Sequence, residues 1–203
     1  MKLAPVLPVL LLVGLAASSA RADHDAPAAR TGVAKEHGHI GLSAGAGTNG
    51  FIGAAARAVI GPGLGWEVRV TTLDNRHVRA ELSYLGSIQE ALDDSELTMR
   101  THGVQGTLRI NVVPSWPVEP FFYIGVGVSR LTAENDPMGR FGGVDYVLDN
   151  PFGFGAAYHY KRWVFDLRAA ISVVTGAQIV TDETMESANL NRFSLRASVG
   201  VEL

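Results

Sequence analysis

Apolar and polar residues alternate one by one along most of the chain. The pattern is clearest at the end, where every second position from Phe193 to Leu203 is apolar and the positions between are polar or small. Strong alternation also runs from Leu64 to Val70, Val78 to Tyr84 and Trp163 to Val173. Weaker alternation covers Ile40–Gly47, Val104–Val112, Phe122–Ser129 and Phe152–Tyr160. A period of two residues is typical of β-strands with one apolar and one polar face, so the sequence predicts an all-β fold of eight strands.

The connections between these strands alternate between short and long. Tight turns are predicted at Asp74–Arg76, Pro114–Pro117 and Tyr160–Arg162. The other links are longer and cover Thr48–Gly63, Gln89–Thr98, Thr132–Asn150 and Gly176–Leu190. Short and long connections therefore lie at opposite ends of the strands. This asymmetry is typical of an antiparallel up-and-down transmembrane barrel with short periplasmic turns and long outer loops.

The first residues predict an export signal. Lys2 precedes the apolar stretch Val6–Ala17, and Ala20-Arg21-Ala22 is the small-x-small pattern that signal peptidase recognises. We expect a signal peptide over residues 1–22, a flexible segment over 23–37 and the barrel over 38–203. The apolar stretch is shorter than the ~20 residues that a helix needs to span a bilayer. An exported chain of this kind is either a soluble domain or a membrane β-barrel.

Composition removes several classes of function. The chain of 203 residues has no cysteine, which excludes disulfide scaffolds, thiolate zinc sites and cysteine nucleophiles. Hydrophobic residues make up 47% and charged residues 18% of the sequence, which argues against a disordered chain. A formal net charge of -3 gives no electrostatic footprint for nucleic acid. We therefore expect no nucleic-acid partner. We also expect no cofactor, because the dinucleotide-like run Gly45–Gly50 follows an alternating strand, and no metal, because His37 and His39 are too few for a site of about four ligands.

If the polar face of each strand points inward, the interior of the barrel is charged. The residues concerned are Glu67, Arg69, Arg79, Glu81, Arg109, Asp166, Arg168, Arg196 and Glu202. The interior of an eight-stranded barrel is only wide enough for side chains to fill, and paired guanidinium and carboxylate groups can occupy it. We interpret the set as a polar plug. The alternative is a narrow or gated ion path.

On its strand number, loop order and last residues, the chain resembles the small eight-stranded outer-membrane barrels of the OmpA/OmpX type over roughly residues 38–203. Its end is similar to the assembly signal of that family, with Ser198, Gly200, Val201 and Leu203 at the polar, glycine and two apolar positions. Leu203 departs from the pattern, because bacterial members usually end in an aromatic residue.

The resemblance implies a place in the outer membrane of a Gram-negative-type envelope. The partners it implies are outer-membrane lipid, lipopolysaccharide and the outer-membrane assembly machinery. It also implies a non-enzymatic role in envelope integrity or surface adhesion through four long outer loops. Loops on a rigid scaffold are the usual place for binding function.

Two other functions fit parts of the sequence. In a soluble periplasmic lipocalin-like carrier, the apolar face would point inward around a ligand. In an outer-membrane lipid-modifying enzyme, a serine nucleophile would need a histidine base within hydrogen-bond reach. The deacylase-like His-x-Ser spacing is absent at His77, His102 and His159, but His102 and Ser172 could still meet across strands.

Overall fold

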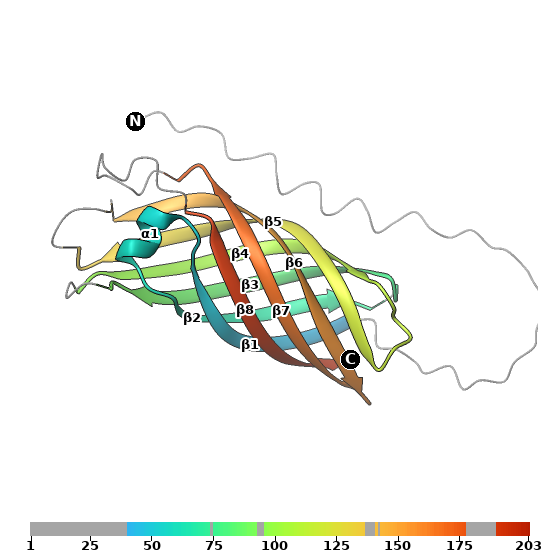
Figure 1. Ribbon diagram of the computed structural model, residues 1–203. Coiled ribbons are helices and arrows are strands. Elements are labelled where there is room, and N and C mark those ends of the chain that lie inside the picture. The colour runs from blue at the N-terminus through green and yellow to red at the C-terminus, as the bar shows by residue number, and fades with distance from the viewer. Residues whose placement is uncertain (1–39, 74, 93–95, 137–140, 142, 178–189) are drawn as a thin grey trace, which may run out of the picture. The chain divides into compact units, whose positions relative to one another are not determined.

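The computed structural model describes residues 40–73, 75–92, 96–136, 141, 143–177 and 190–203. The predicted signal peptide and the predicted segment 23–37 lie outside the described residues. The described part of the chain forms a closed antiparallel barrel of eight strands (Figure 1). Its elements are β1 (Ile40–Phe51), α1 (Ala54–Val59), β2 (Gly63–Thr72), β3 (Val78–Glu90), β4 (Thr98–Asn111), β5 (Val118–Glu134), β6 (Val144–Tyr160), β7 (Trp163–Thr175) and β8 (Arg192–Glu202).

The first and last strands close the barrel. β1 and β8 pair continuously from Gly41 opposite Glu202 to Phe51 opposite Arg192. The backbone N–H of Leu203 adds a hydrogen bond of 2.8 Å to the carbonyl of Ile40. Closure removes the unpaired strand edges that would otherwise invite association with other chains. The alternating terminal segment therefore forms a barrel strand like the others.

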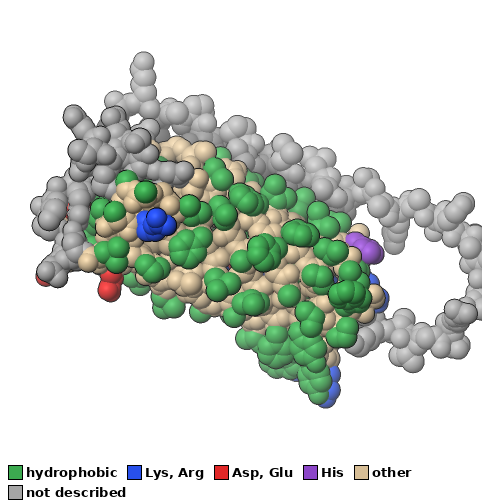
Figure 2. Space-filling model, in the orientation of Figure 1, with side chains coloured by type: hydrophobic (Ala, Val, Ile, Leu, Met, Phe, Trp, Pro, Cys, Tyr) green, Lys and Arg blue, Asp and Glu red, His purple; other side chains and the backbone are tan. Residues whose placement is uncertain are grey.

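The alternation in the sequence places apolar side chains outside and polar ones inside. Leu64, Phe122 and Ile124 are each about 60% exposed, whereas Glu81 and Arg109 are buried. Figure 2 shows hydrophobic side chains spread over the visible face of the strands. A lipocalin-like carrier needs the opposite arrangement, so that alternative is wrong for this chain.

Most of the strands are longer than the sequence predicts, and the difference is largest for β5 and β6. β5 and β6 each have 17 residues, and their pairing continues to Thr132 opposite Val144. Most of the predicted loop Thr132–Asn150 is therefore strand. The reason is an inversion of the pattern near the long-loop end, where Leu131 points inward and its neighbour Arg130 points outward. The backbone pairing continues through this region, although apolar side chains there are no longer confined to the outer face.

The predicted loop Thr48–Gly63 is largely ordered. β1 extends to Phe51, and the alanine-rich segment that follows forms the short helix α1. Ala56 of the helix and Ile60 after it are buried in an apolar cluster at the long-loop end of the barrel. Within the described residues, no helix is long and apolar enough to cross a membrane.

Candidate functional site in the barrel interior

Arginine and aspartate or glutamate side chains fill the interior near its middle. Arg168 on β7 makes a bidentate ion pair with Glu81 on β3, with hydrogen bonds of 2.7 and 2.8 Å. Arg168 Nε also donates to Asp166 at 2.7 Å, and Arg109 Nη1 on β4 donates to Asp166 at 3.2 Å. Removing one partner from such a buried set would leave a charge without compensation, which is strongly destabilising. These side chains thus depend on one another.

A second group extends the network to β2 and β8. Arg69 lies 3.3 Å from Glu67 and 3.7 Å from Asp166, and its Nη2 donates to Ser198 at 2.8 Å. Arg196 donates to Glu67 at 3.5 Å. Five strands, β2, β3, β4, β7 and β8, therefore contribute to one connected set of charges.

Aromatic rings form one wall of this network. The guanidinium carbon of Arg109 lies 3.8 Å from the ring centre of Phe121, and that of Arg168 lies 4.9 Å from Phe121 and 5.1 Å from Tyr123. Stacking on an aromatic face stabilises a desolvated guanidinium. A Cβ at Gly155 on β6 would lie 2.4 Å from the ring of Phe121, so only glycine leaves room for this ring. Glycine on β6 thus positions the aromatic wall.

A third group lies at the short-turn end. His159 on β6 bridges Glu119 on β5 at 3.2 Å and Glu202 on β8 at 3.1 Å. Arg79 on β3 lies 3.8 Å from Glu119. Glu119 and His159 are absent from the predicted charge set, because the proline turn and the weak alternation of β6 obscure their phase. Extending the period of two back from Tyr123 would have included Glu119.

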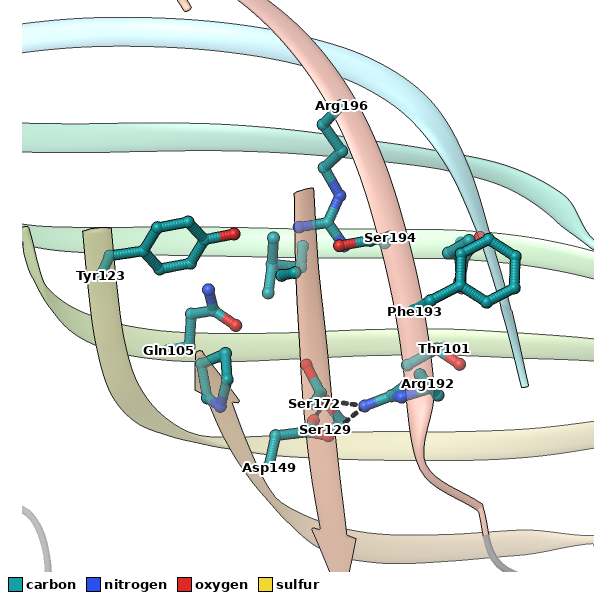
Figure 3. Close-up of a pocket in the computed structure, with 16 residues that line it drawn as sticks. Thr101, Gln105, Tyr123, Ser129, Asp149, Ser172, Arg192, Phe193, Ser194 and Arg196 are labelled. Atoms are coloured by element: carbon teal, nitrogen blue, oxygen red, sulfur yellow. Dashed lines mark hydrogen bonds and ion pairs between the residues drawn. The ribbon is translucent and has the colours of Figure 1, made fainter. Parts of the chain in front are cut away.

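A small polar cavity lies toward the long-loop end. It has a volume of about 30 Å³. Ser129 donates to Asp149, and Arg192 pairs with the same carboxylate; Figure 3 shows these side chains converging from β5, β6 and β8. Neither charged residue of this cluster belongs to the predicted charge set: Asp149 falls within the predicted loop Thr132–Asn150, and Arg192 stands at the very start of the terminal alternating segment.

The long-loop end of the interior is apolar. The cluster draws on α1, several strands and the connections between them. Its buried members are Phe51, Ala56, Ile60, Leu97, Met99, Leu131, Phe141, Val147 and Leu190. The interior thus has three layers: an ion-pair network that extends to the short turns, a small polar cavity and an apolar cluster.

All nine residues of the predicted charge set point into the barrel. Seven are buried, while the side chains of Arg196 and Glu202 keep 16% and 14% exposure. Two members of the set have partners that the sequence did not predict: Arg79 lies 3.8 Å from Glu119, and Glu202 lies 3.1 Å from His159. Pairing partners depend on the stagger of the strands, which the sequence pattern does not give.

The four residues of the predicted assembly signal divide between the two faces of β8. Ser198 and Gly200 face the interior, while Val201 and Leu203 face outward. A Cβ at Gly200 would lie 2.7 Å from the carbonyl oxygen of Leu42 on β1. Gly200 therefore has a packing role in barrel closure, whatever its part in assembly.

The proposed encounter of His102 with Ser172 does not occur. His102 faces outward from β4, where its Nδ1 lies 2.9 Å from the hydroxyl of Tyr84. Ser172 faces inward from β7 and lines the polar cavity. The sequence alone does not show that the two residues face opposite sides of the barrel wall, because the alternation is inverted around His102 on β4.

The fold is similar to that of known small membrane barrels. No protein-family model and no curated protein sequence matches the chain. Its structure is similar to that of Neisserial surface protein A, with a TM-score of 0.60, 11% identity and coverage of 81% of this chain and 97% of that one. It is also similar to Ail, the attachment invasion locus protein of Yersinia pestis, with a TM-score of 0.55, 9% identity and coverage of 82% and 99%. These matches confirm the predicted eight-stranded fold.

Proposed function

We propose that this protein is an integral outer-membrane barrel with a sealed lumen. Its long loops form a binding surface at the cell exterior. The observation that carries the proposal is the inverted distribution of polarity. Charged side chains fill the interior, while leucine, valine and phenylalanine side chains are exposed around the strands. Monomeric soluble proteins rarely expose apolar patches beyond a few hundred Å². A bilayer is the environment in which such a surface is stable.

Aromatic residues support the same placement. At the short-turn ends of β6 and β7, Tyr158, Tyr160, Trp163 and Phe165 are each exposed on the outer face. Membrane barrels carry such aromatic girdles where the apolar band meets the headgroups. The opposite border of the band lies where the alternation inverts, beside Arg100 on β4 and Arg130 on β5. Beyond this border β4 and β5 have polar outer and apolar inner residues, as expected for a part that stands in water.

The three interior layers support a sealed lumen. Arg168, Glu81 and Asp166 in the ion-pair network are joined by hydrogen bonds of 2.7 to 3.0 Å, so this part has little tendency to rearrange. The polar cavity is small, with a volume of about 30 Å³. The apolar cluster closes the long-loop side with side chains that do not hydrate ions. A barrel of this kind acts through its outer surface, and we assign it a non-enzymatic role in envelope integrity or adhesion.

Fractionation and gel mobility test this proposal. The protein should sediment with outer membranes, resist carbonate extraction and migrate faster on a denaturing gel when unheated than when boiled, because a closed strand ladder resists detergent. Carbonate-soluble protein with one mobility would contradict the membrane assignment.

A further inference from the structure

The outer face of the barrel carries charge in one region. Among the outward-facing strand residues that the structure describes, the charged or histidine side chains gather at the long-loop ends of β3, β4 and β5. They are Glu90, Arg100, His102, Arg130 and Glu134. The outward residues of the five other strands are apolar, small, aromatic or uncharged polar. This charged group is therefore a candidate binding surface at the edge of the apolar band.

Arg130 differs from its neighbour Arg100 in its contacts. Arg100 Nε lies 3.1 Å from Glu134, so its charge is compensated within the protein. Arg130 is exposed and has no hydrogen bond or ion pair with any described residue. The outward residue before it on β5 is Val128, which is 46% exposed. It belongs to the apolar belt, the band of exposed apolar side chains around the strands. A cation at the edge of the hydrocarbon region is costly unless an anion or water meets it there.

His102 lies beside Arg130 and is held in place. The two residues are direct cross-strand partners between β4 and β5. The hydroxyl of Tyr84 lies 2.9 Å from His102 Nδ1, and the ring of Trp66 meets the imidazole edge-on with centroids 5.9 Å apart. When the tyrosine donates to Nδ1, the neutral imidazole carries its proton on Nε2 and can donate to another oxygen.

A glycine makes this arrangement possible. Gly86 on β3 pairs with both Trp66 and His102, and it separates them on the outer face. A Cβ at Gly86 would lie 2.2 Å from the indole ring of Trp66, so the ring lies across the glycine to reach the histidine. On the other side, Arg130 pairs with Tyr146 of β6, which is 65% exposed. The donors therefore lie between aromatic side chains of the type found at membrane interfaces.

We propose that Arg130 and His102 bind the phosphate of an outer-leaflet lipid headgroup. The inference rests on the proposed orientation, with the long loops outside. A guanidinium offers two parallel N–H groups to a phosphate, and His102 Nε2 adds a donor from the adjacent strand. The apolar belt below Arg130 accommodates acyl chains of the same lipid. A free phosphate ion would lack this apolar contact, so the site favours a phosphorylated lipid over the ion.

Native mass spectrometry of the full-length protein in a neutral detergent tests the site. The probes are bisphosphorylated lipid A, the same lipid with both phosphates removed, and inorganic phosphate. Wild-type protein should retain the phosphorylated lipid and bind the dephosphorylated lipid roughly tenfold more weakly, as expected for the loss of one charged hydrogen-bonded contact. Equal binding of both lipids, or binding of inorganic phosphate with equal affinity, would overturn the proposal.

Three variants locate the binding on the protein. Arg130→Gln should weaken lipid A binding roughly tenfold, and Arg130→Lys should retain most of it because the charge remains. Arg162→Gln is the matched control, since it removes an exposed arginine from the short-turn end. Equal affinities for Arg130→Gln and wild type, or an equal loss in Arg162→Gln, would contradict the site.

The gel-mobility test separates this inference from the proposed function. Each variant is first shown to migrate faster unheated than boiled, which establishes a folded barrel. A folded Arg130→Gln protein with unchanged lipid A affinity would refute the phosphate site and leave the barrel assignment intact. Loss of the heat shift in wild type would instead refute the membrane proposal.

Discussion

Arg168 and Glu81 join two strands that are not neighbours in the barrel. Arg168 projects from β7 and Glu81 from β3, and their two hydrogen bonds of 2.7 and 2.8 Å cross the lumen. The strand ladder connects each strand only to its neighbours. This ion pair therefore braces opposite walls of the barrel, and Asp166 and Arg109 continue the brace toward β4.

Removing the arginine of this pair should destabilise the barrel. Arg168→Met leaves Glu81 buried without its main partner, and we expect a loss of about 3–5 kcal/mol in the free energy of unfolding. Urea titration of the protein in lipid vesicles, followed by tryptophan fluorescence, measures the loss. Glu90→Gln is the control, since it removes an exposed carboxylate from β3, the strand that carries Glu81. Equal unfolding midpoints for Arg168→Met and wild type would show that the brace carries no stability.

The lumen should remain closed in planar bilayers. Wild-type protein should give no stable single-channel steps, because ion pairs and the apolar cluster both obstruct the path. The double variant Glu81→Ala with Arg168→Ala should also remain silent, since the apolar cluster around Leu131 is untouched. Large and stable steps from wild-type protein would contradict the sealed lumen, whereas steps from the double variant alone would assign the seal to the ion pairs.

A methyl group at Gly155 should be poorly tolerated. Its Cβ would lie 2.4 Å from both the Phe121 ring and the carbonyl oxygen of Leu167, so Gly155→Ala should lower the unfolding free energy by about 1–3 kcal/mol. Gly106→Ala is the matched control, because no atom lies within 4 Å of its Cβ position. Thermal unfolding in detergent, monitored by gel mobility, compares the two. A similar effect of both substitutions would argue against a packing role for Gly155.

The end of β8 should respond differently at two positions. Gly200→Ala places a Cβ 2.7 Å from the backbone of β1, so it should slow barrel closure both in detergent and in membranes that contain the assembly machinery. Leu203→Phe supplies the aromatic residue of the assembly signal that the end of β8 resembles, and it should accelerate only the assisted reaction. Appearance of the fast-migrating gel band with time measures both rates. If Leu203→Phe also accelerated folding in detergent, where the assembly machinery is absent, recognition by that machinery would be excluded as the cause.

The sequence is informative where the membrane imposes a regular pattern. Glu81 and Arg168 lie in two of the most regular alternating segments, and their inward orientation follows directly from the period of two. Their mutual pairing does not, because it depends on the stagger between β3 and β7 around the closed barrel. The alternation along the sequence predicts which face of the strand each residue lies on, but it does not predict its ion-pair partner across the lumen.

The pattern fails where the environment changes. At the long-loop end, Met99 and Leu131 point inward while Arg100 and Arg130 point outward, so a rule that places apolar residues outside cannot assign the phase. The predicted loop Thr132–Asn150 and the missed Asp149 both come from this region. An inversion of alternation without a break in the strand is itself a signal for the edge of the apolar belt.

Cysteine labelling on intact cells tests whether the long loops lie outside the cell and the short turns in the periplasm. The protein has no cysteine, so Glu134→Cys near the long loops and Ser115→Cys on a short turn each introduce the single thiol of the chain. With an impermeant maleimide on intact cells, Glu134→Cys should label, and Ser115→Cys should label only after the outer membrane is breached. Equal protection of both sites in intact cells, at normal expression, would contradict the transmembrane assignment.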